Sequence, residues 1–325
     1  MCHPQRRADG KNGIFRMKKE VRVFAPATVA NVACGFDIFG FALETPGDEI
    51  VVRLKSQPGV ALSKITGDGG VLSLDPEKNT AGVGVLKLLA HLNSNQGIEI
   101  ELHKKMPMGS GLGSSAASAA GSLFAVNEIL GSPLTPRELI PFAMEAERVA
   151  CGSAHADNVA SALLGGFVLI RSYQPLDIIE IPLRTDLYCC VLHPKIEIRT
   201  EMARQILQEK VLLSQLVSQS GNAAGLIAGL IQGDISLISR CLEDVVIEPV
   251  RANLIPGFYE IKAAAMAAGA LGCSISGSGP SIFALTQKKT QAEKVGLAMT
   301  NACKSIGIDS DLYVSSINKQ GPRIL

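Results

Sequence analysis

The sequence contains no tryptophan, and aromatic residues make up only 4% of its 325 positions. Proteins that bind single-stranded nucleic acid stack bases on aromatic side chains, so this scarcity argues against such a role. No charge of one sign dominates either: 31 Lys and Arg oppose 30 Asp and Glu, for a formal net charge of +1. The balance excludes a strongly basic nucleic-acid binder at the level of the whole chain.

No continuous hydrophobic run is long enough to cross a membrane. Three stretches carry no charged residue, at 106–127, 211–233 and 263–287, but Gly, Ser or Gln interrupts each and two contain Pro. A membrane span needs roughly 20 predominantly apolar residues. The stretches therefore predict buried segments of a globular protein, with 211–233 as helical core or an oligomer face.

Closely spaced cysteines are also missing. No C-x-x-C pair occurs, so we expect reduced core thiols instead of zinc ligands or disulfides; the cysteines are Cys2, Cys34, Cys151, Cys189, Cys190, Cys241, Cys273 and Cys303. Residues 1–16 lack the apolar region of a signal peptide. We expect them to form a mobile N-terminal extension before a natural start at Met17, in a cytoplasmic protein.

Length and periodicity favour α+β structure in two domains, because strands and helices alternate in short succession. The expected strands are 20–24, 49–54, 98–105, 165–170, 187–192, 274–285 and 311–315, and the expected helices are 79–92, 114–130, 201–208, 214–231, 235–242 and 258–268. A further helix begins with a capping box at Thr135 and Glu138 and is expected to kink at Pro141. We set the domain boundary near residue 180, which divides the chain into 17–180 and 181–325.

A glycine-rich turn follows the strand expected at 98–105. Residues 107–116 read PMGSGLGSSA, and three alternate glycines let the backbone turn sharply and approach an anion closely. The helix that begins at Ser114 would offer unpaired N–H groups and its positive dipole end to phosphate. Ser114 and Ser115 add hydroxyl groups. The alternative is a strand-to-helix turn that binds no ligand.

Two better-known nucleotide loops fit these residues poorly. A Walker A loop needs a Lys after its glycines, and none follows here. A dinucleotide fingerprint counted from Gly109 has Ser114 in place of its last glycine, and Glu128 comes too early to serve as the ribose carboxylate. A nicotinamide-dependent oxidoreductase is therefore the weakest interpretation.

The run P-x-G-S-G-L-G-S-S-A-A resembles the phosphate loop of the GHMP kinases, which include galactokinase, homoserine kinase, mevalonate kinase and phosphomevalonate kinase. APATVANVACGFD at 25–37 resembles the N-terminal motif of this family, and GCSISGSGPS at 272–281 resembles its C-terminal glycine motif. The resemblance covers essentially everything after Met17. It implies a two-domain GHMP-kinase-like fold, with an N-terminal ribosomal-protein-like α/β domain that binds ATP and a C-terminal ferredoxin-like α+β domain that contributes to the substrate site.

Within this family, NVACGFDIFG at 31–40 and ERVACGSAHADNVA at 147–160 look most like the homoserine kinases. The resemblance implies ATP-dependent phosphorylation of the L-homoserine hydroxyl to O-phospho-L-homoserine, in threonine biosynthesis. It assigns substrate binding to Asn31, Asp37, His155, Thr200, Arg204 and Arg251. Their chemistry suits the substrate, because the planar fork of Arg pairs a carboxylate and an Asp attracts an ammonium group. Asn31 would hold the hydroxyl.

Each assignment has an ordinary structural alternative. Asn31 and Asp37 could be turn residues that bond their own backbone, although a lone Asp in an uncharged run of small residues needs a reason. Arg204 and Arg251 could be surface residues, and His155 could be a satisfied structural histidine.

The resemblance also implies sites for ATP and Mg²⁺. The ATP-binding residues would be Asn79, Pro107, Gly109, Ser110, Gly111, Leu112, Gly113, Ser114, Ser115 and Ala116. Ser115 and Glu147 would hold the metal, since Mg²⁺ takes one or two protein oxygens beside phosphates and waters. A helix cap at Asn79 and a solvated pair of Glu147 with Arg148 are the alternatives.

The expected mechanism has no dedicated general base. Some relatives place an Asp against the attacking hydroxyl, and in this sequence that position looks like Asn158, which cannot usefully accept a proton. Asp157 is adjacent, but neighbouring side chains point in different directions. We expect direct attack, with Asn31 orienting the hydroxyl and Asn158 and the loop N–H groups stabilising the developing charge.

Other interpretations stay open. Mevalonate carries no ammonium group, so a mevalonate kinase would leave Asp37 without a purpose, and a galactokinase would want no paired Arg. A threonine-like alcohol differs by one methyl group, which is weakly discriminated. A non-catalytic ATP or amino-acid sensor on the same fold is the alternative from another class. A small-molecule substrate is expected as partner, and a homodimer is possible.

Overall fold

The computed structural model describes residues 19–152 and 155–325. The expected extension at 1–16 and the proposed start at Met17 lie outside the described residues. Among the helices of the described part, none is long and apolar enough to cross a membrane.

The first sheet has seven strands, in the order β11-β1-β2-β4-β3, with β5 paired to β2 and β6 paired to β5. All pairs are antiparallel except β3 with β4. The strands are β1 (Glu20–Ala30), β2 (Phe39–Lys55), β3 (Val60–Thr66), β4 (Gly97–His103), β5 (Phe167–Tyr173), β6 (Leu176–Ile181) and β11 (Arg323–Ile324). The long β2 pairs with β5 at residues 39–41 and with β4 at residues 49–55, so it joins both ends of the sheet.

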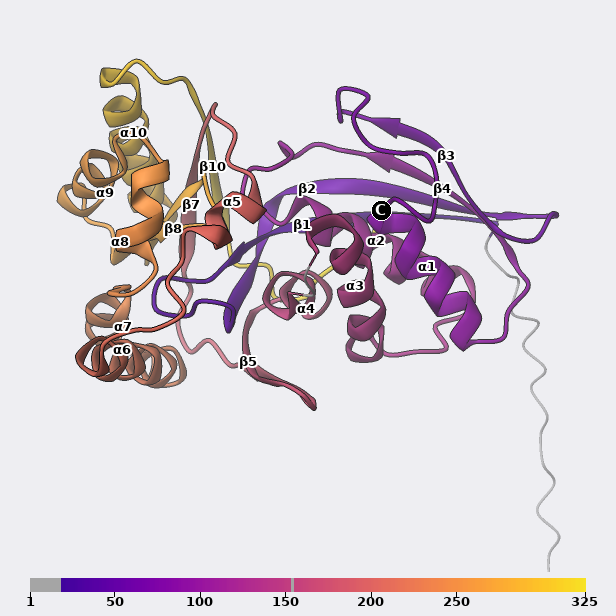
Figure 1. Cartoon of the computed structure of the whole chain (residues 1–325), viewed down its shortest axis with the longest axis horizontal. Coiled ribbons are helices and arrows are strands. Elements are labelled where there is room, and N and C mark those ends of the chain that lie inside the picture. The colour runs from indigo at the N-terminus through magenta and orange to yellow at the C-terminus, as the bar shows by residue number, and fades with distance from the viewer. Residues whose placement is uncertain (1–18, 153–154) are drawn as a thin grey trace, which may run out of the picture.

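Four helices cover one face of this sheet (Figure 1). They are α1 (Thr80–His91), α2 (Ser114–Ile129), α3 (Pro136–Cys151) and α4 (Ala156–Leu164). Helices α2 and α4 pack on β1 and β2, and α3 packs on the other helices. Most of α2 is buried on every side, which explains why 106–127 carries no charge. The capping box at Thr135 and Glu138 is confirmed, and α3 continues through Pro141.

The second sheet has the order β10-β7-β9-β8, and all its pairs are antiparallel. Its strands are β7 (Tyr188–Pro194), β8 (Gly272–Ile275), β9 (Ile282–Thr286) and β10 (Ser310–Ser316), and α9 (Phe258–Ala267) and α10 (Lys289–Ser305) pack on them. The chain order strand–helix–strand–strand–helix–strand is that of a ferredoxin-like unit. The α+β fold class is therefore confirmed, and the segment expected at 274–285 consists of two strands joined by a tight turn.

Several short helices lie between β7 and β8. They are α5 (Thr200–Gln205), α7 (Ile235–Cys241), α8 (Glu248–Arg251) and a 3₁₀ turn (Ala252–Leu254), together with the longer α6 (Leu213–Gln232). Helix α6 accounts for the uncharged run at 211–233. It packs on α7, but Leu212, Leu213 and Val217 near its start are 69%, 74% and 66% exposed.

The second sheet is buried on both faces. In β7, Cys189 and Val191 join the large core that fills the space around the first sheet, while Cys190 and Leu192 join a smaller core under α9 and α10. Alternate side chains of a strand point to opposite faces, so both faces of β7 need apolar residues. The six cysteines whose side chains are described are buried free thiols, as expected; Cys2 and the side chain of Cys151 lie outside the description.

The three glycine-containing motifs meet at one point. Residues 107–113 form a loop between β4 and α2, enclosed by β1 on one side and by the turn between β8 and β9 on the other. Three carbonyl groups of the loop accept hydrogen bonds from these neighbours: Leu112 from the Thr28 N–H (3.0 Å), Ser110 from the Ser281 N–H (3.1 Å) and Gly111 from Ser276 Oγ (2.7 Å). The Gly277 N–H donates to the carbonyl of Ala30 at 3.0 Å, which ties the two outer segments together.

This enclosure makes a prediction about two glycines of the loop. Gly109 and Gly111 both have left-handed φ angles, of 63° and 80°. A Cβ atom on Gly111 would lie 2.3 Å from the Ser276 carbonyl oxygen, whereas a Cβ on Gly109 would meet nothing within 4 Å. Alanine at either position costs about 1–2 kcal/mol of backbone strain, and at Gly111 the overlap adds about 1–3 kcal/mol.

Urea unfolding of Gly109→Ala and Gly111→Ala measures the difference, and Gly109→Ala serves as the matched control for backbone strain. We expect Gly111→Ala to lose more free energy of unfolding than Gly109→Ala. Equal losses would show that the loop is not enclosed in this way.

Candidate active site

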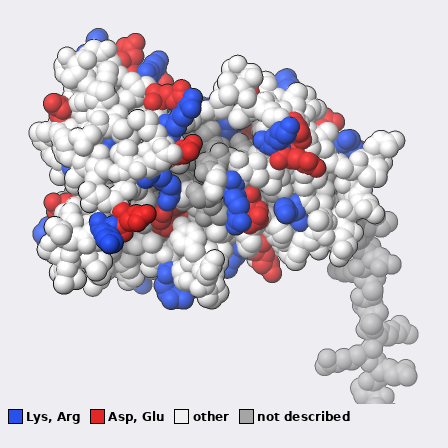
Figure 2. All heavy atoms as spheres, viewed as in Figure 1, with Lys and Arg blue, Asp and Glu red and all other residues white. Residues whose placement is uncertain are grey.

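A cavity of about 480 Å³ lies where the three motifs meet. On the surface it corresponds to the hollow between the two lobes in Figure 2, with Lys and Arg as well as Asp and Glu along its edges. The predicted residues that line it are Asn31, Asp37, Asn79, Gly109, Ser110, Gly111, Gly113, Ser114, Ser115, Glu147, His155, Asn158, Thr200, Arg204 and Arg251. Leu112 and Ala116 are fully buried behind the loop, and these two and Pro107 are not among the lining residues.

The start of α2 opens on this cavity. Gly113 precedes the helix in a left-handed conformation with φ 66°, and no side chain caps the first turn. The hydroxyl oxygen of Ser114 is buried and has no hydrogen-bond partner among the described residues. Unpaired N–H groups at a helix N-terminus, together with a buried hydroxyl, form a suitable environment for phosphate oxygens.

A buried lysine lies beneath the start of α2. Lys104 donates to the Ser114 carbonyl and to Ser118 Oγ, both at 2.8 Å, and forms an ion pair with Asp48. Asp48 also accepts the N–H of Lys105 at 2.7 Å and that of Met106 at 3.2 Å. Burial lowers the pKa of Lys104, and the charge of Asp48 opposes that shift.

Lys104 lines the cavity, and the sequence analysis did not identify it. A signal was present, because Ile98, Ile100 and Leu102 alternate along β4 and are all buried. Continued by two residues, this alternation directs Lys104 to the same inward face.

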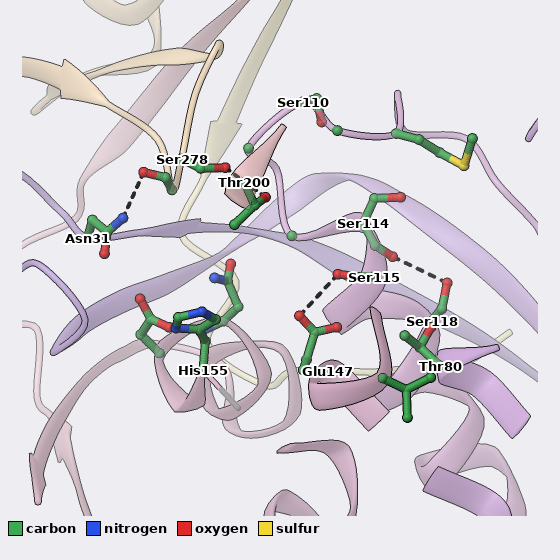
Figure 3. A pocket seen from close by; sticks show the side chains of 18 of the residues that line it. Asn31, Thr80, Ser110, Ser114, Ser115, Ser118, Glu147, His155, Thr200 and Ser278 are labelled. Atoms are coloured by element: carbon green, nitrogen blue, oxygen red, sulfur yellow. Dashed lines mark hydrogen bonds between the residues drawn. The ribbon is translucent and has the colours of Figure 1, made fainter. Parts of the chain in front are cut away.

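Glu147 and Ser115 lie side by side in the wall of the cavity, with their side chains pointing toward one another (Figure 3). Ser115 Oγ donates to Glu147 Oε2 at 3.1 Å. Glu147 is 4% exposed as a residue, and burial raises the pKa of its carboxyl group to about 7. Two hard oxygen donors beside the uncapped start of α2 suit Mg²⁺. Within 19–152 and 155–325, no group of three or more His, Cys, Asp or Glu side chains could hold a metal by itself.

Asp37 and Arg204 form an ion pair on the opposite side of the cavity. Arg204 Nη2 donates to both carboxylate oxygens of Asp37, at 2.7 and 2.9 Å, and contacts His155 Nδ1 at 3.0 Å. Burial alone would raise the pKa of Asp37, but the contacts with His155 and Arg204 hold it below its usual value. Arg204 Nε is buried and has no hydrogen-bond partner in the described part of the chain.

Arg251 is the second guanidinium group of this side. It is 3% exposed, and it donates to the carbonyls of Ala203 (3.1 Å) and Gly277 (3.0 Å). Burial, together with the nearby charge of Arg204, lowers the pKa of Arg251 to about 10. The ring of Phe36 lies 5.5 Å from the Arg204 guanidinium carbon and 5.0 Å from that of Arg251.

The side chain of Asn31 connects the walls of the cavity. Its Nδ2 donates to the Gly277 carbonyl at 2.7 Å, and its Oδ1 accepts the N–H of Asp37 at 2.9 Å. Each group retains capacity for one more hydrogen bond. Thr200 Oγ1 lies 3.1 Å from Ser278 Oγ, and Figure 3 shows the two side chains next to each other.

Asp157 and Asn158 both line the cavity. Asn158 Oδ1 accepts a hydrogen bond from Thr28 Oγ1 at 2.7 Å, next to Gly113 of the phosphate loop. Asp157 Oδ1 accepts the N–H of Asn158 at 3.0 Å. Burial, together with the charge of Asp37, raises the pKa of Asp157 to about 6.

Asn79 caps α1, which was its structural alternative. Its Oδ1 accepts the N–H of Ala81 at 3.0 Å and its Nδ2 donates to the Ser73 carbonyl at 2.9 Å. The lining residues that sequence reasoning missed are Leu72, Lys78, Thr80, Lys104, Met108, Ser118, Val149, Gly277 and Ser278. Gly277 and Ser278 lie inside the recognised C-terminal motif, whereas Leu72 lies in a loop without periodic signal.

Comparison with known proteins agrees with this geometry. Residues 79–166 match the model of the GHMP kinases N terminal domain, and residues 226–305 match the model described as GHMP kinases C terminal. A homoserine kinase from Chloroherpeton thalassium is 53% identical over 318 residues, which cover 94% of this chain and 100% of that protein.

Solved structures show the same fold. The crystal structure of homoserine kinase from Cytophaga hutchinsonii superposes with a TM-score of 0.93 at 55% identity, covering 95% of this chain and 98% of the other. The crystal structure of L. major mevalonate kinase in complex with R-mevalonate has a TM-score of 0.72 at 15% identity, and the match covers 93% of this chain and 98% of the other. The second similarity shows the fold alone.

The ion pair beneath the phosphate loop generates a stability prediction. The Lys104 and Asp48 side chains are each 2% exposed, so Asp48→Asn leaves a buried ammonium group without its counter-ion. Loss of one partner of a buried pair costs about 3–5 kcal/mol.

Glu180→Gln is the matched control, because Glu180 and Arg137 form an ion pair whose side chains are 56% and 48% exposed. An exposed pair contributes at most about 1 kcal/mol. Chemical denaturation at neutral pH compares the two variants, and a loss for Asp48→Asn as small as that for Glu180→Gln would contradict the assignment.

Proposed function

The chain belongs to the GHMP kinases and, among them, to the homoserine kinase family, and from this premise we propose its reaction: transfer of the γ-phosphoryl group of ATP to the hydroxyl of L-homoserine. The products are O-phospho-L-homoserine, an intermediate of threonine biosynthesis, and ADP. The enzyme is a phosphotransferase with an alcohol group as acceptor. The observation that carries the proposal is the Asp37–Arg204 ion pair, which shares one cavity with the phosphate loop.

The ion pair fits an amino-acid substrate. L-Homoserine brings an ammonium and a carboxylate, and these two charges replace the contacts that Asp37 and Arg204 make with each other. Arg204 still has its buried Nε to offer, beside the guanidinium group of Arg251. Together they match the bidentate geometry that a carboxylate prefers. His155 and Thr200 complete this substrate end.

The other end of the cavity suits ATP. The open first turn of α2, the loop glycines and the Ser114 hydroxyl supply donors for the phosphates, and Asn79 lies near the adenine side in our assignment. Lys104 adds a fixed positive charge under the same helix turn. When bound, Mg²⁺ would be held by Ser115 and Glu147 and would neutralise phosphate charge.

Phosphoryl transfer depends on positioning and on charge stabilisation. We assign to Asn31 the orientation of the substrate hydroxyl, because its amide is fixed by Gly277 and by the Asp37 N–H. We assign to Asn158 and the loop N–H groups the stabilisation of the developing charge, because Asn158 adjoins Gly113. No general base takes part in this mechanism.

Rival substrates fit the charges less well. Mevalonate has no ammonium group for Asp37, and galactose has no carboxylate for Arg204 and Arg251. A non-catalytic sensor would not need Glu147 bonded to Ser115 beside the phosphate loop. The proposal also assigns ATP binding to residues 17–180 and a substrate contribution to 181–325, and it includes a cytoplasmic location and a possible homodimer.

ADP release with Mg·ATP tests the substrate assignment. L-Homoserine, L-threonine, mevalonate and galactose are compared in parallel, with 4-hydroxybutyrate as a matched analogue that lacks only the ammonium group. We expect the highest kcat/KM with L-homoserine, because it alone places both charges and a primary hydroxyl. Turnover of mevalonate without turnover of L-homoserine would overturn the proposal.

Asp157→Asn tests the absence of a general base. A positioned base contributes roughly 10²–10⁴-fold to a rate, whereas we expect kcat of the variant to stay within about tenfold of the parent enzyme. The measurement is kcat at saturating ATP and L-homoserine, with both dissociation constants determined by calorimetry. Complete loss of turnover with both substrates still bound would identify Asp157 as the base.

A further inference from the structure

Helix α6 (Leu213–Gln232) lies outside the cavity, but the side chain of Gln219 bonds two of the segments that build the substrate end. Gln219 lies in the second turn of this uncharged helix and does not line the cavity. Its amide group makes three hydrogen bonds, to Cys34, Asp244 and Val245. These partners belong to two separate segments of the chain.

The first segment is the loop between β1 and β2. Gln219 Nε2 donates to the Cys34 carbonyl at 3.1 Å, three residues before Asp37. The loop is strained, since Asn31, Ala33 and Asp37 have φ angles of 67°, 52° and 58°. Non-glycine residues keep such conformations only where their surroundings hold them. An external bond at Cys34 is part of that restraint.

The second segment leads into α8, the short helix that ends at Arg251. Gln219 Nε2 also donates to Asp244 Oδ1 at 2.9 Å, and Gln219 Oε1 accepts the N–H of Val245 at 3.0 Å. Asp244 is buried, and its carboxylate accepts three backbone N–H groups at the start of α8: those of Val246, Ile247 and Glu248, each at 2.9 Å. Gln219 thereby fixes the carboxylate that organises this turn.

One more bond joins the same two segments. Cys34 Sγ donates to the Cys241 carbonyl at 3.3 Å, just before Asp244 in the chain. The ring of Phe36, carried by the first segment, packs against the guanidinium group of Arg251, carried by the second. The position of Asp37 relative to Arg251 therefore depends on how these segments are held together behind the cavity.

We propose that Gln219 is a positioning residue for the amino-acid substrate: its single amide sets the spacing between the carboxylate of Asp37 and the guanidinium group of Arg251. This inference rests on the proposed function for the identity of the substrate. ATP binds at the other end of the cavity, so the effect of Gln219 is specific to the amino-acid substrate.

Two substitutions of Gln219 and one matched control test the inference. Gln219→Met keeps the length of the side chain and removes all three bonds. Gln219→Glu keeps the acceptor for Val245 but turns a carboxylate oxygen toward the Cys34 carbonyl and Asp244, both of which are acceptors. Asn222→Ala is the control, because Asn222 lies on the next turn of α6 and its side chain donates one hydrogen bond, to the Glu243 carbonyl at 3.1 Å.

We expect Gln219→Met to raise the KM for L-homoserine about tenfold, the effect of losing a small hydrogen-bonded network. The KM for ATP and kcat should stay within about twofold. Gln219→Glu should raise the KM for L-homoserine at least as much, and Asn222→Ala should leave all three constants unchanged. Equal changes in both KM values, or none in either, would overturn the inference.

Amide hydrogen exchange provides a readout that does not depend on turnover. Gln219→Met should accelerate exchange both in residues 32–38 and in residues 245–251, while Asn222→Ala accelerates neither. If the parent enzyme fails to phosphorylate L-homoserine, the proposed function is wrong, and exchange alone decides the role of Gln219. Acceleration in both segments supports the positioning role, and acceleration in one or none refutes it.

Discussion

The site depends on one set of contacts, the backbone hydrogen bonds that hold the phosphate loop between β1 and the turn after β8. The carbonyl groups of Ser110, Gly111 and Leu112 face these neighbours, so the N–H groups at the start of α2 are left facing the cavity. A loop held through its acceptors on one side keeps its donors available on the other. In our assignment the loop needs no lysine of its own to bind phosphate, because Lys104, which follows β4, reaches the start of α2.

Charge inside the cavity is arranged in pairs of different strength. Lys104 and Asp48 are almost fully buried and tightly bonded, and they act as a fixed support. Asp37 and Arg204 are 27% and 35% exposed, and their contact can be exchanged for the charges of a ligand. The first kind of pair is costly to disturb, whereas the second is accessible to solvent and screened by it. Stability and recognition are thus assigned to separate ion pairs.

The sequence predicted the parts of the fold that have a local signal. The phosphate loop, the capping box at Thr135 and most long helices could be identified from residue type and spacing, and the motifs at 25–37 and 272–281 from their resemblance to the GHMP kinases. Strand β1 was predicted only to residue 24, because nearly every later residue in it is buried and no alternation distinguishes it from a loop. Strands β3, β6 and β11 and helices α4, α8 and α10 were missed. Strand β3 is short, and two of its seven positions are exposed.

The candidate site was predicted in its composition but not in its contacts. Fifteen of the predicted residues line one cavity, because the motifs that contain them were recognisable. The pairing of Asp37 with Arg204 joins positions 167 residues apart, and no local pattern encodes such a contact. Lys104 could have been found by extending the alternation of β4, whereas Gln219 carries no signal in an uncharged helix.

The way in which the chain leaves the second sheet restricts how the cavity can open. After β10, the backbone N–H of Asn318 donates to the Ala42 carbonyl at 2.9 Å, and the Asn318 carbonyl accepts the N–H of Gly166 at 2.6 Å. The segment that follows β10 is therefore bonded on one side to β2 and on the other to the residue before β5. A hinge rotation of one lobe away from the other would have to break these backbone hydrogen bonds. We therefore expect substrates and products to exchange through rotamer changes and small displacements of short elements. One such element is α5, the six-residue helix that carries Arg204.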